Sequence, residues 1–274
     1  MTQGDPDSDF RIAVGPDEGV AGFGHVWATP PGEVRGFIRV RPSAKGRGVG
    51  AALLSWLERR AREIANELNL ETGPVLTLTS WAQDSDAAPF LTRAGFVPAR
   101  YFLQMRIDLV QAQLPAAVWP EGVENRCFRL GIDDARLFAS FREAFADHWG
   151  DAEVSEDEWW SENRIAPNAG YDPTLWFVAL DCEAVAGFSI CREREADGEV
   201  IGWVSLLGVR PRWRGRGLGE ALLTQSLSVF RERGHRRAAL NVDVENASGA
   251  LRLYEKTGMT PVPAFTVWSK ALRS

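Results

Sequence analysis

The sequence predicts an α/β (α+β) fold that contains two copies of one domain. Short apolar runs that suit strands alternate with longer stretches of helical period, and this order of segments occurs twice. The first copy reads FIRVRPSAKGRGVGAALLSWLE at residues 37–58, and the second reads LLGVRPRWRGRGLGEALLTQSL at residues 206–227. The offset of 169 residues, from Val40 to Val209, is too long for a solenoid repeat and fits two copies of a whole domain.

The composition is that of a globular chain. Of its 274 residues, 45% are hydrophobic and 25% are charged, so the chain is apolar enough to bury one large core or two ordinary ones. A formal net charge of −6 argues against bulk nucleic-acid binding, which needs clustered positive charge. The three cysteines have neither disulfide-framework nor zinc spacing. No apolar run is long enough to span a membrane, and the N-terminus lacks the pattern of a signal peptide. We therefore expect a cytoplasmic protein without a metal site.

The segments that follow each copy also correspond. Each copy continues with a strand, a helix that ends in glycine, and a second strand. Glycine suits a helix C-terminus because the residue there often takes a positive φ. The expected segments are 75–81, 90–96 with Gly95 and 99–109 in the first copy, and 238–244, 252–259 with Gly258 and 264–272 in the second.

The second copy has a longer stretch of chain before its VRP sequence than the first copy. Ser155 and Glu158 have the spacing of a capping box, which predicts that a helix begins there. The first copy has only about 36 residues before its VRP sequence, so we expect it to lack the first strand and both front helices. The expected segments are strands 124–130, 175–181 and 184–194 with helices 133–149 and 155–164 in the second copy, and strands near 10–14, 21–28 and 34–40 in the first.

These patterns predict three parts of the chain. The first is an N-terminal domain over residues 1–110, and the last is a C-terminal domain over residues 124–274. Residues 111–123 between them contain two prolines and a glycine, which are typical of a linker.

A glycine-rich turn lies between a strand and a helix in the second copy. The start of a helix leaves backbone N–H groups unpaired and carries a partial positive charge. Glycines let an anion approach these groups closely, so the turn suits a diphosphate. It is neither a P-loop nor a dinucleotide GxGxxG motif, and tight packing alone is the alternative explanation. The turn consists of Arg214, Gly215, Arg216, Gly217, Leu218 and Gly219.

A second motif downstream makes a family resemblance plain. The combination of VRPRWRGRGLGEALL with ENASGALRLYEKTG resembles the GNAT superfamily of acyl-coenzyme A transferases. The resemblance is strong over residues 124–272 and moderate over residues 10–109. It implies two tandem GNAT-like domains, each a mixed, mostly antiparallel sheet flanked by helices, with the N-terminal copy shortened at its front.

The resemblance also implies roles for residues of the second copy. Leu207, Gly208 and Val209 would offer main-chain hydrogen bonds to acetyl-CoA, residues 214–219 would hold its diphosphate, and Asn246 would contact its arm. Tyr254 would protonate the leaving thiolate, which agrees with the pKa of about 10 of a phenol. A core tyrosine on an amphipathic helix is the alternative for Tyr254. The expected reaction is acetyl transfer to a primary amine of a small molecule.

The general base is not evident from the sequence. Two tandem domains in one chain of this size resemble the mycothiol synthases, in which a Glu on the fourth strand of the second domain acts as the base. The matching residue here is Trp203, and this departure weakens that assignment. Any tryptophan near the acceptor pocket is more readily explained by core packing. The candidate bases are Glu143, Asp147, His148, Glu199 and Asp243, and the tryptophans that could line a pocket are Trp149, Trp159, Trp160 and Trp203.

The first copy resembles a weakened form of the second. The position that matches Tyr254 is Leu91, which cannot donate a proton. We therefore expect this half either to bind coenzyme A without catalysis or only to support the fold. Its weaker candidate cofactor site consists of Val40, Lys45, Gly46, Arg47, Gly48, Val49 and Gly50.

Other functions stay open at this point. The chain could acetylate a cysteinyl amine as the mycothiol synthases do, or the N-terminus or a lysine of a protein. It could also hold acyl-CoA as a sensor without turnover, which Leu91 favours for the first half and Tyr254 disfavours for the second.

Overall fold

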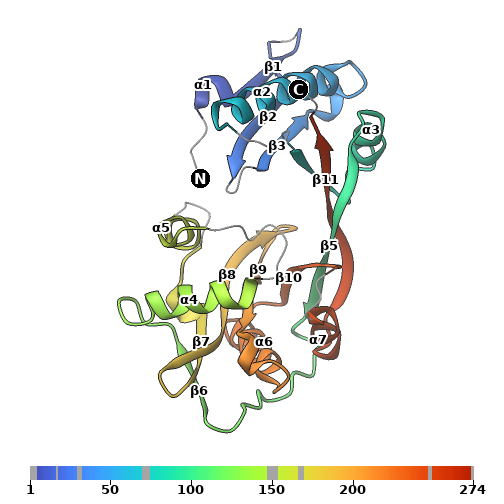
Figure 1. The fold of residues 1–274 in the computed structure, drawn as a ribbon. Coiled ribbons are helices and arrows are strands. Elements are labelled where there is room, and N and C mark those ends of the chain that lie inside the picture. The colour runs from blue at the N-terminus through green and yellow to red at the C-terminus, as the bar shows by residue number, and fades with distance from the viewer. Residues whose placement is uncertain are drawn as a thin grey trace. The chain divides into compact units, whose positions relative to one another are not determined.

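The computed structural model describes residues 5–16, 18–29, 33–69, 75–146, 154–165, 170–245 and 249–272. The chain forms two compact units (Figure 1). One consists of residues 1–101 and 265–274, and the other consists of residues 102–264. Each unit holds its own part of a β-sheet with helices packed on it, as predicted.

The sheet of the first unit has the strand order β1-β2-β3-β4-β11. Only the β3–β4 pair is parallel, as expected when a helix connects two strands of one sheet. The strands predicted near 10–14, 21–28, 34–40 and 75–81 are thereby confirmed. The elements are β1 (Phe10–Val14), β2 (Val20–Thr29), β3 (Glu33–Val40), β4 (Val75–Trp81) and β11 (Thr260–Ala271), with helices α1 (Pro6–Asp9), α2 (Val49–Glu67) and α3 (Ala87–Arg93).

Helix α2 covers one face of this sheet. Its apolar side chains, Leu57 among them, are buried against Val26 and Leu76 of the strands. Glycines on the facing strands allow the close approach, because a Cβ at Gly36 would lie 2.9 Å from Leu57 Cδ1. This packing gives the first unit its own hydrophobic core.

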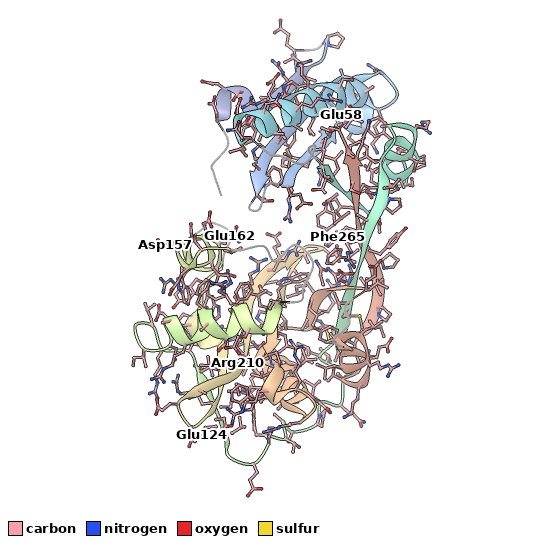
Figure 2. The ribbon with its side chains drawn as sticks, in the orientation of Figure 1. Glu58, Glu124, Asp157, Glu162, Arg210 and Phe265 are labelled. Carbon is pink, nitrogen blue, oxygen red and sulfur yellow. The ribbon has the colours of Figure 1, made fainter. Side chains whose placement is uncertain are left out.

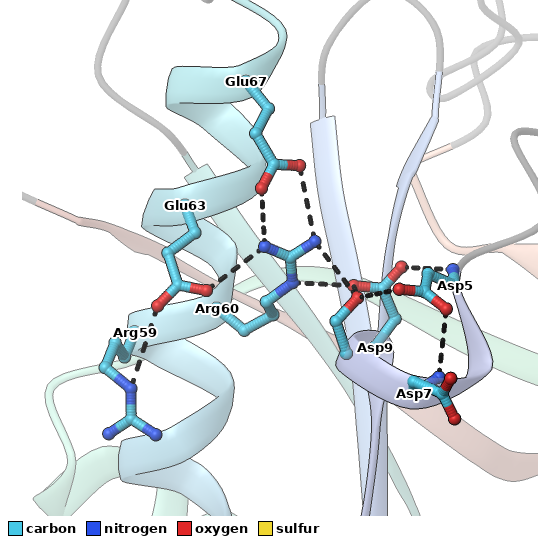
Figure 3. A network of polar contacts seen from close by, with 8 residues as sticks. Asp5, Asp7, Asp9, Arg59, Arg60, Glu63 and Glu67 are labelled. Carbon is cyan, nitrogen blue, oxygen red and sulfur yellow. Dashed lines mark hydrogen bonds and ion pairs between the residues drawn. The ribbon is translucent and has the colours of Figure 1, made fainter.

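The start of the first unit is held to α2 by a polar cluster (Figure 3). Arg60 donates to Asp9 at 2.7 Å and to Glu67 at 2.7 Å. Both Arg60 and Asp9 are largely buried, with side-chain exposures of 13% and 8%. Ionic groups withdrawn from water in this way need each other as partners. The cluster therefore fixes α1 and β1 on the helix.

The sheet of the second unit has the order β5-β10-β9-β8-β7-β6. Its strands pair antiparallel except for β9 and β10. The mixed, mostly antiparallel sheet is thus confirmed here. The elements are β5 (Val97–Asp108), β6 (Val123–Cys127), β7 (Trp176–Asp181), β8 (Ala184–Ala196), β9 (Glu199–Val209) and β10 (Arg237–Asp243), with helices α4 (Asp134–Phe145), α5 (Glu156–Trp160), α6 (Leu218–Glu232) and α7 (Ala250–Lys256).

The two front helices of the second unit close an aromatic core. Trp159 and Trp160 of α5 are buried and meet ring to ring with Trp176 of β7. The capping box is confirmed, since Ser155 Oγ accepts from the Glu158 backbone and the Glu158 carboxylate accepts from the Ser155 backbone. The first helix runs to Phe145, and the predicted residues 147–149 lie outside the described part.

The units exchange strands, so they differ from the predicted continuous ranges 1–110 and 124–274. Residues 102–108 of β5 pair with β10 in the second unit, and residues 265–271 of β11 pair with β4 in the first. Trp268 accordingly lies in the core of the first unit, and Lys270 bonds to Glu58 of α2 at 2.7 Å. Glu58 is labelled in Figure 2. A sequence pattern shows that a strand exists but not which neighbour it pairs with. Residues 110–122, where most of the linker is predicted, contain no helix or strand.

Three further features concern the described residues alone. No helix in them is both long and apolar enough to cross a membrane. They contain no cluster of three or more potential metal-ligating His, Cys, Asp or Glu side chains. The cysteines are free thiols, two exposed and one buried.

Candidate active site

The candidate site begins where β9 and β10 part. Their parallel ladder joins Ala238 to Gly202 and Ala239 to Trp203, and goes no further along these fully described strands. Beyond it, β9 continues to Val209 without a partner on β10. The predicted main-chain positions Leu207, Gly208 and Val209 lie in this stretch, so the β9 edge that faces β10 is free for hydrogen bonds to a ligand.

A β-bulge lies at the same point of β9. The register against β8 shifts from Cys191–Val204 to Ile190–Leu206, which leaves Ser205 as the extra residue. A bulge bends a strand and increases its twist. The bulge is therefore a physical reason for the β9–β10 ladder to end at this point.

The glycine-rich turn of the second unit is open. Gly215 and Gly217 have φ of 74° and 83°, and no atom lies within 4 Å of the place that a Cβ would take on either. No side chain caps the start of α6, so its first N–H groups are left for a ligand. Trp213 anchors the turn, because its ring is buried and its Nε1 donates to Asp181 at 2.8 Å. This geometry fits a diphosphate.

The two arginines of the turn differ. Arg214 donates to the carbonyl of Val209 at 3.1 Å and to that of Ala144 at 2.9 Å, so it ties the turn to β9 and α4. Arg216 is exposed. Unlike Arg214, Arg216 has no hydrogen bond to another residue among those that the structure describes.

Helix α7 packs on the first turn of α6. A Cβ on Gly219 would lie 3.3 Å from Leu253 Cδ2, and Lys256 Nζ lies 2.6 Å from Glu220 Oε2. These contacts bring Tyr254, the next residue after Leu253, to the same end of the sheet as the turn. The helix ends as predicted, with Gly258 at φ 86° and the Met259 N–H donating to the Tyr254 carbonyl at 3.0 Å.

Tyr254 is buried, with 7% of its surface exposed. Burial disfavours the phenolate and raises the pKa of Tyr254 to about 12. Among the residues that the structure describes, none makes a hydrogen bond to its hydroxyl. The phenol is therefore protonated at neutral pH and has a proton to donate.

The structure separates the candidate bases. Glu143 receives two hydrogen bonds from Arg210, at 2.7 and 2.6 Å, and these lower its pKa (Arg210 is labelled in Figure 2). Glu199 is paired with Arg237. Asp243 lies at the end of β10, where it accepts from the Glu245 backbone at 2.9 Å. The candidates Asp147 and His148, the predicted arm contact Asn246, and Trp149 lie outside the described residues.

Trp203 is a packing residue. It is 5% exposed and buried beside Ile201 and Ala239. The guanidinium of Arg194 lies 4.5 Å from the centre of its ring, a cation–π distance. An indole cannot take up a proton, so Trp203 cannot act as the general base. Trp159 and Trp160 are core residues as well.

Two polar residues of this region could not be identified from the sequence. Ser205 Oγ and Asn241 Oδ1 are buried, and neither has a hydrogen-bond partner among the described residues. Their significance depends on the bulge and on the end of the ladder. Neither feature leaves a signal in a single sequence.

The first unit contains an equivalent glycine-rich turn, but the charged side chains around it differ. Gly46 and Gly48 have φ of 75° and 83°, again with open space at each Cβ. Lys45, however, bonds to Asp84 at 2.8 Å and to Asp86 at 3.1 Å. Two carboxylates thus lie near this turn, where they would repel a diphosphate. Leu91, at the position that matches Tyr254, is buried in the core of this unit.

Known proteins show the same architecture. Residues 135–259 match the model of the acetyltransferase (GNAT) family, and residues 7–98 match an acetyltransferase (GNAT) domain. A mycothiol acetyltransferase of Acidothermus cellulolyticus is 32% identical over 254 residues, covering 87% of this chain and 72% of the relative. One of Thermomonospora curvata is 34% identical, covering 88% and 75%.

A solved structure agrees over the whole chain. The GCN5-related N-acetyltransferase of Sphaerobacter thermophilus superposes with a TM-score of 0.79 at 29% identity, covering 100% of this chain and 84% of that one. Both the sequence relatives and this structure therefore span the two units together. The chain belongs to the acetyltransferase (GNAT) family, with two such domains in tandem, and is an N-acetyltransferase.

Proposed function

We propose that the second unit transfers the acetyl group of acetyl-CoA to a primary amine of a small molecule. The observation that carries this proposal is the convergence of three features at one end of one sheet. They are the open turn at Gly215 and Gly217, the unpaired edge of β9 up to Val209, and the buried phenol of Tyr254.

The residues present fit the shape and charge of acetyl-CoA. The N–H groups of residues 215–219 and the side chain of Arg216 would hold the diphosphate. The β9 edge at Leu207, Gly208 and Val209 would hydrogen-bond the pantetheine arm, and Arg214 would hold this edge and the turn together through the Val209 carbonyl. Asn246 is proposed to contact the arm on the strength of the motif.

The reaction proposed for this site is direct attack. The neutral amine nitrogen attacks the thioester carbonyl, and a main-chain N–H near Val209 stabilises the oxyanion. The carbon–sulfur bond then breaks, and Tyr254 gives its proton to the departing thiolate. The nitrogen loses its extra proton to solvent, which leaves an N-acetyl product and coenzyme A.

A second candidate acceptor is a cysteinyl amine. The relatives at 32% and 34% identity are named mycothiol acetyltransferases, which favours it. Against it stands Trp203, buried beneath Arg194 where those enzymes are expected to carry a glutamate. Acetylation of a protein amine and non-catalytic binding of acyl-CoA are the remaining alternatives.

Incubation with acetyl-CoA and an amine panel separates these functions. The panel holds S-methyl-L-cysteinamide, glucosamine, a polyamine and a lysine peptide, with product masses as the readout. Acetylation of any of the first three supports the proposal, and acetylation of S-methyl-L-cysteinamide alone identifies the cysteinyl acceptor. Acetylation of the peptide alone favours the protein acceptor. Binding of acetyl-CoA without any product would identify a binding module and contradict the proposal.

A further inference from the structure

Ser205 on β9 and Asn241 on β10 each lie two residues beyond the last pair of the ladder that joins these strands. The last pair of the parallel ladder is Trp203 with Ala239. Two residues further along, Ser205 on β9 and Asn241 on β10 would be the next partners on the same face if the ladder continued. The bulge at Ser205 lies at the step where this ladder has ended.

Both side chains carry a buried oxygen that lacks a partner among the described residues. These atoms are Ser205 Oγ and Asn241 Oδ1. A buried polar group without a hydrogen bond destabilises the fold, so two of them on neighbouring strands require an explanation. By contrast, the buried hydroxyl of Ser189 on β8 is satisfied by Ser226 at 2.8 Å.

The position of the pair relative to the reaction suggests its role. The unpaired β9 edge, which is proposed to bind the thioester arm, begins at this step. An amine that attacks the thioester there must first lose a proton, and Trp203 cannot accept it. An amide oxygen and a hydroxyl supply the polar partners that a buried water needs.

We propose that Ser205 and Asn241 together hold a water molecule that takes the proton from the acceptor ammonium. The inference rests on the proposed function of the second unit. The water accepts the proton as the amine becomes neutral, and passes it on along this face. Both side chains are positioning residues, since the water and not the protein meets the amine.

The charged and polar groups on this face of the sheet set the path of the proton. Asp243 follows Asn241 by two residues on β10 and is the carboxylate nearest in register, so it is the proposed destination. The remaining groups come from the strands packed on either side. They are Gln104 and Arg106 on β5, opposite Asn241 and Ala239, and Arg192 and Arg194 on β8, opposite Trp203 and Ile201.

The first test compares S205A and N241A with the native chain, using S-methyl-L-cysteinamide as the acceptor. The pKa of an α-amine is about 8, so most of the acceptor is protonated at pH 6.5 and neutral at pH 9. We expect kcat to fall about 10- to 100-fold at pH 6.5 and to recover to within about threefold at pH 9, with the KM for acetyl-CoA unchanged. An equal loss at both pH values would overturn the proposal, because damage to packing does not depend on the charge of the acceptor.

Two variants serve as controls. N241D keeps an oxygen acceptor at the same position and is expected to retain most of the activity at pH 6.5. S189A removes a buried hydroxyl that already has a protein partner, and its loss, if any, should not vary with pH. A pH-dependent loss in S189A, or inactivity of N241D together with full binding of acetyl-CoA, would count against the water.

The second test does not depend on finding an acceptor. A high-resolution crystal structure with coenzyme A is expected to show an ordered water within hydrogen-bonding distance of both Ser205 Oγ and Asn241 Oδ1, and to lose it in N241A. Direct bonding of either oxygen to a protein group, or an absent water, would overturn the inference. Calorimetry with coenzyme A on the native chain tests the proposed function separately, because it reports on the turn at residues 215–219.

Discussion

Gly217 and Gly48 adopt the same left-handed conformation, each with φ of 83°, at the start of matching helices. Neither has an atom within 4 Å of the position that an added methyl group would occupy. Alanine at either position therefore carries the same backbone strain, about 1–2 kcal/mol. The two substitutions form a matched pair that separates strain from function.

We expect G217A to raise the KM for acetyl-CoA at least tenfold, because the strained turn no longer presents its N–H groups in the same place. G48A should lose a similar amount of stability and leave turnover nearly intact. Steady-state kinetics and chemical denaturation on both variants check this. Equal kinetic losses would show that the first unit also binds the cosubstrate for turnover, despite the two aspartates beside Lys45.

Removal of the Tyr254 hydroxyl tests the proposed acid. We expect Y254F to lower kcat about 10²- to 10⁴-fold, the usual contribution of a general acid, and to leave the KM for acetyl-CoA within about twofold. An acyl-CoA analogue with a more acidic leaving thiol should narrow the difference between the native chain and the variant. Undiminished kcat in Y254F would mean that the tyrosine only packs the core.

The same residue makes stability sensitive to alkali. Burial raises the pKa of Tyr254 to about 12 in the folded chain, against about 10 in the unfolded chain. A raised pKa contributes stability that is complete below pH 10 and is lost as the pH rises toward 12. Between pH 9 and pH 11 the native chain should lose about 1.4 kcal/mol more than Y254F. Parallel loss in the two chains, measured by denaturant unfolding, would contradict this.

Arg60 and Arg59 are neighbours on α2 with very different settings (Figure 3). Arg60 is largely buried and bonds to Asp9 at 2.7 Å, whereas Arg59 is 61% exposed and lies 3.9 Å from Glu63. We expect R60M to destabilise the first unit by about 1–3 kcal/mol, since Asp9 would keep a buried charge without its main partner. R59M should change stability by less than about 0.5 kcal/mol. Thermal unfolding of the two variants measures the difference, and similar values would refute the role of the cluster.

Features with a local signal could be predicted from the sequence. The turn at Gly217, the capping box at Ser155 and the helix end at Gly258 each depend on residues within one or two turns of chain, and each is confirmed. The register of sheets is not local. The partner of β5 lies more than 100 residues away in sequence, so the exchange of last strands could not be predicted.

The candidate site likewise contains features that the sequence predicts and features that it does not. The glycine-rich turn at residues 214–219 and Tyr254 could be identified from motifs, and their binding and catalytic roles are proposals. Ser205 and Asn241 have no motif, because their meaning comes from a bulge that shifts β9 against β8. The hydrogen bonds from Arg214 to the Val209 and Ala144 carbonyls could not be predicted either, since Ala144 belongs to a helix that is distant in the sequence.

The exchanged strands make the fold of each half depend on the other half. A deletion that removed the first copy would also remove residues 102–108, and β10 would then present a bare, aggregation-prone edge. The half that carries Leu91 in place of a tyrosine therefore supplies a strand that the second half needs, whatever its own chemistry. The last strand of each copy is thus part of the fold of the other.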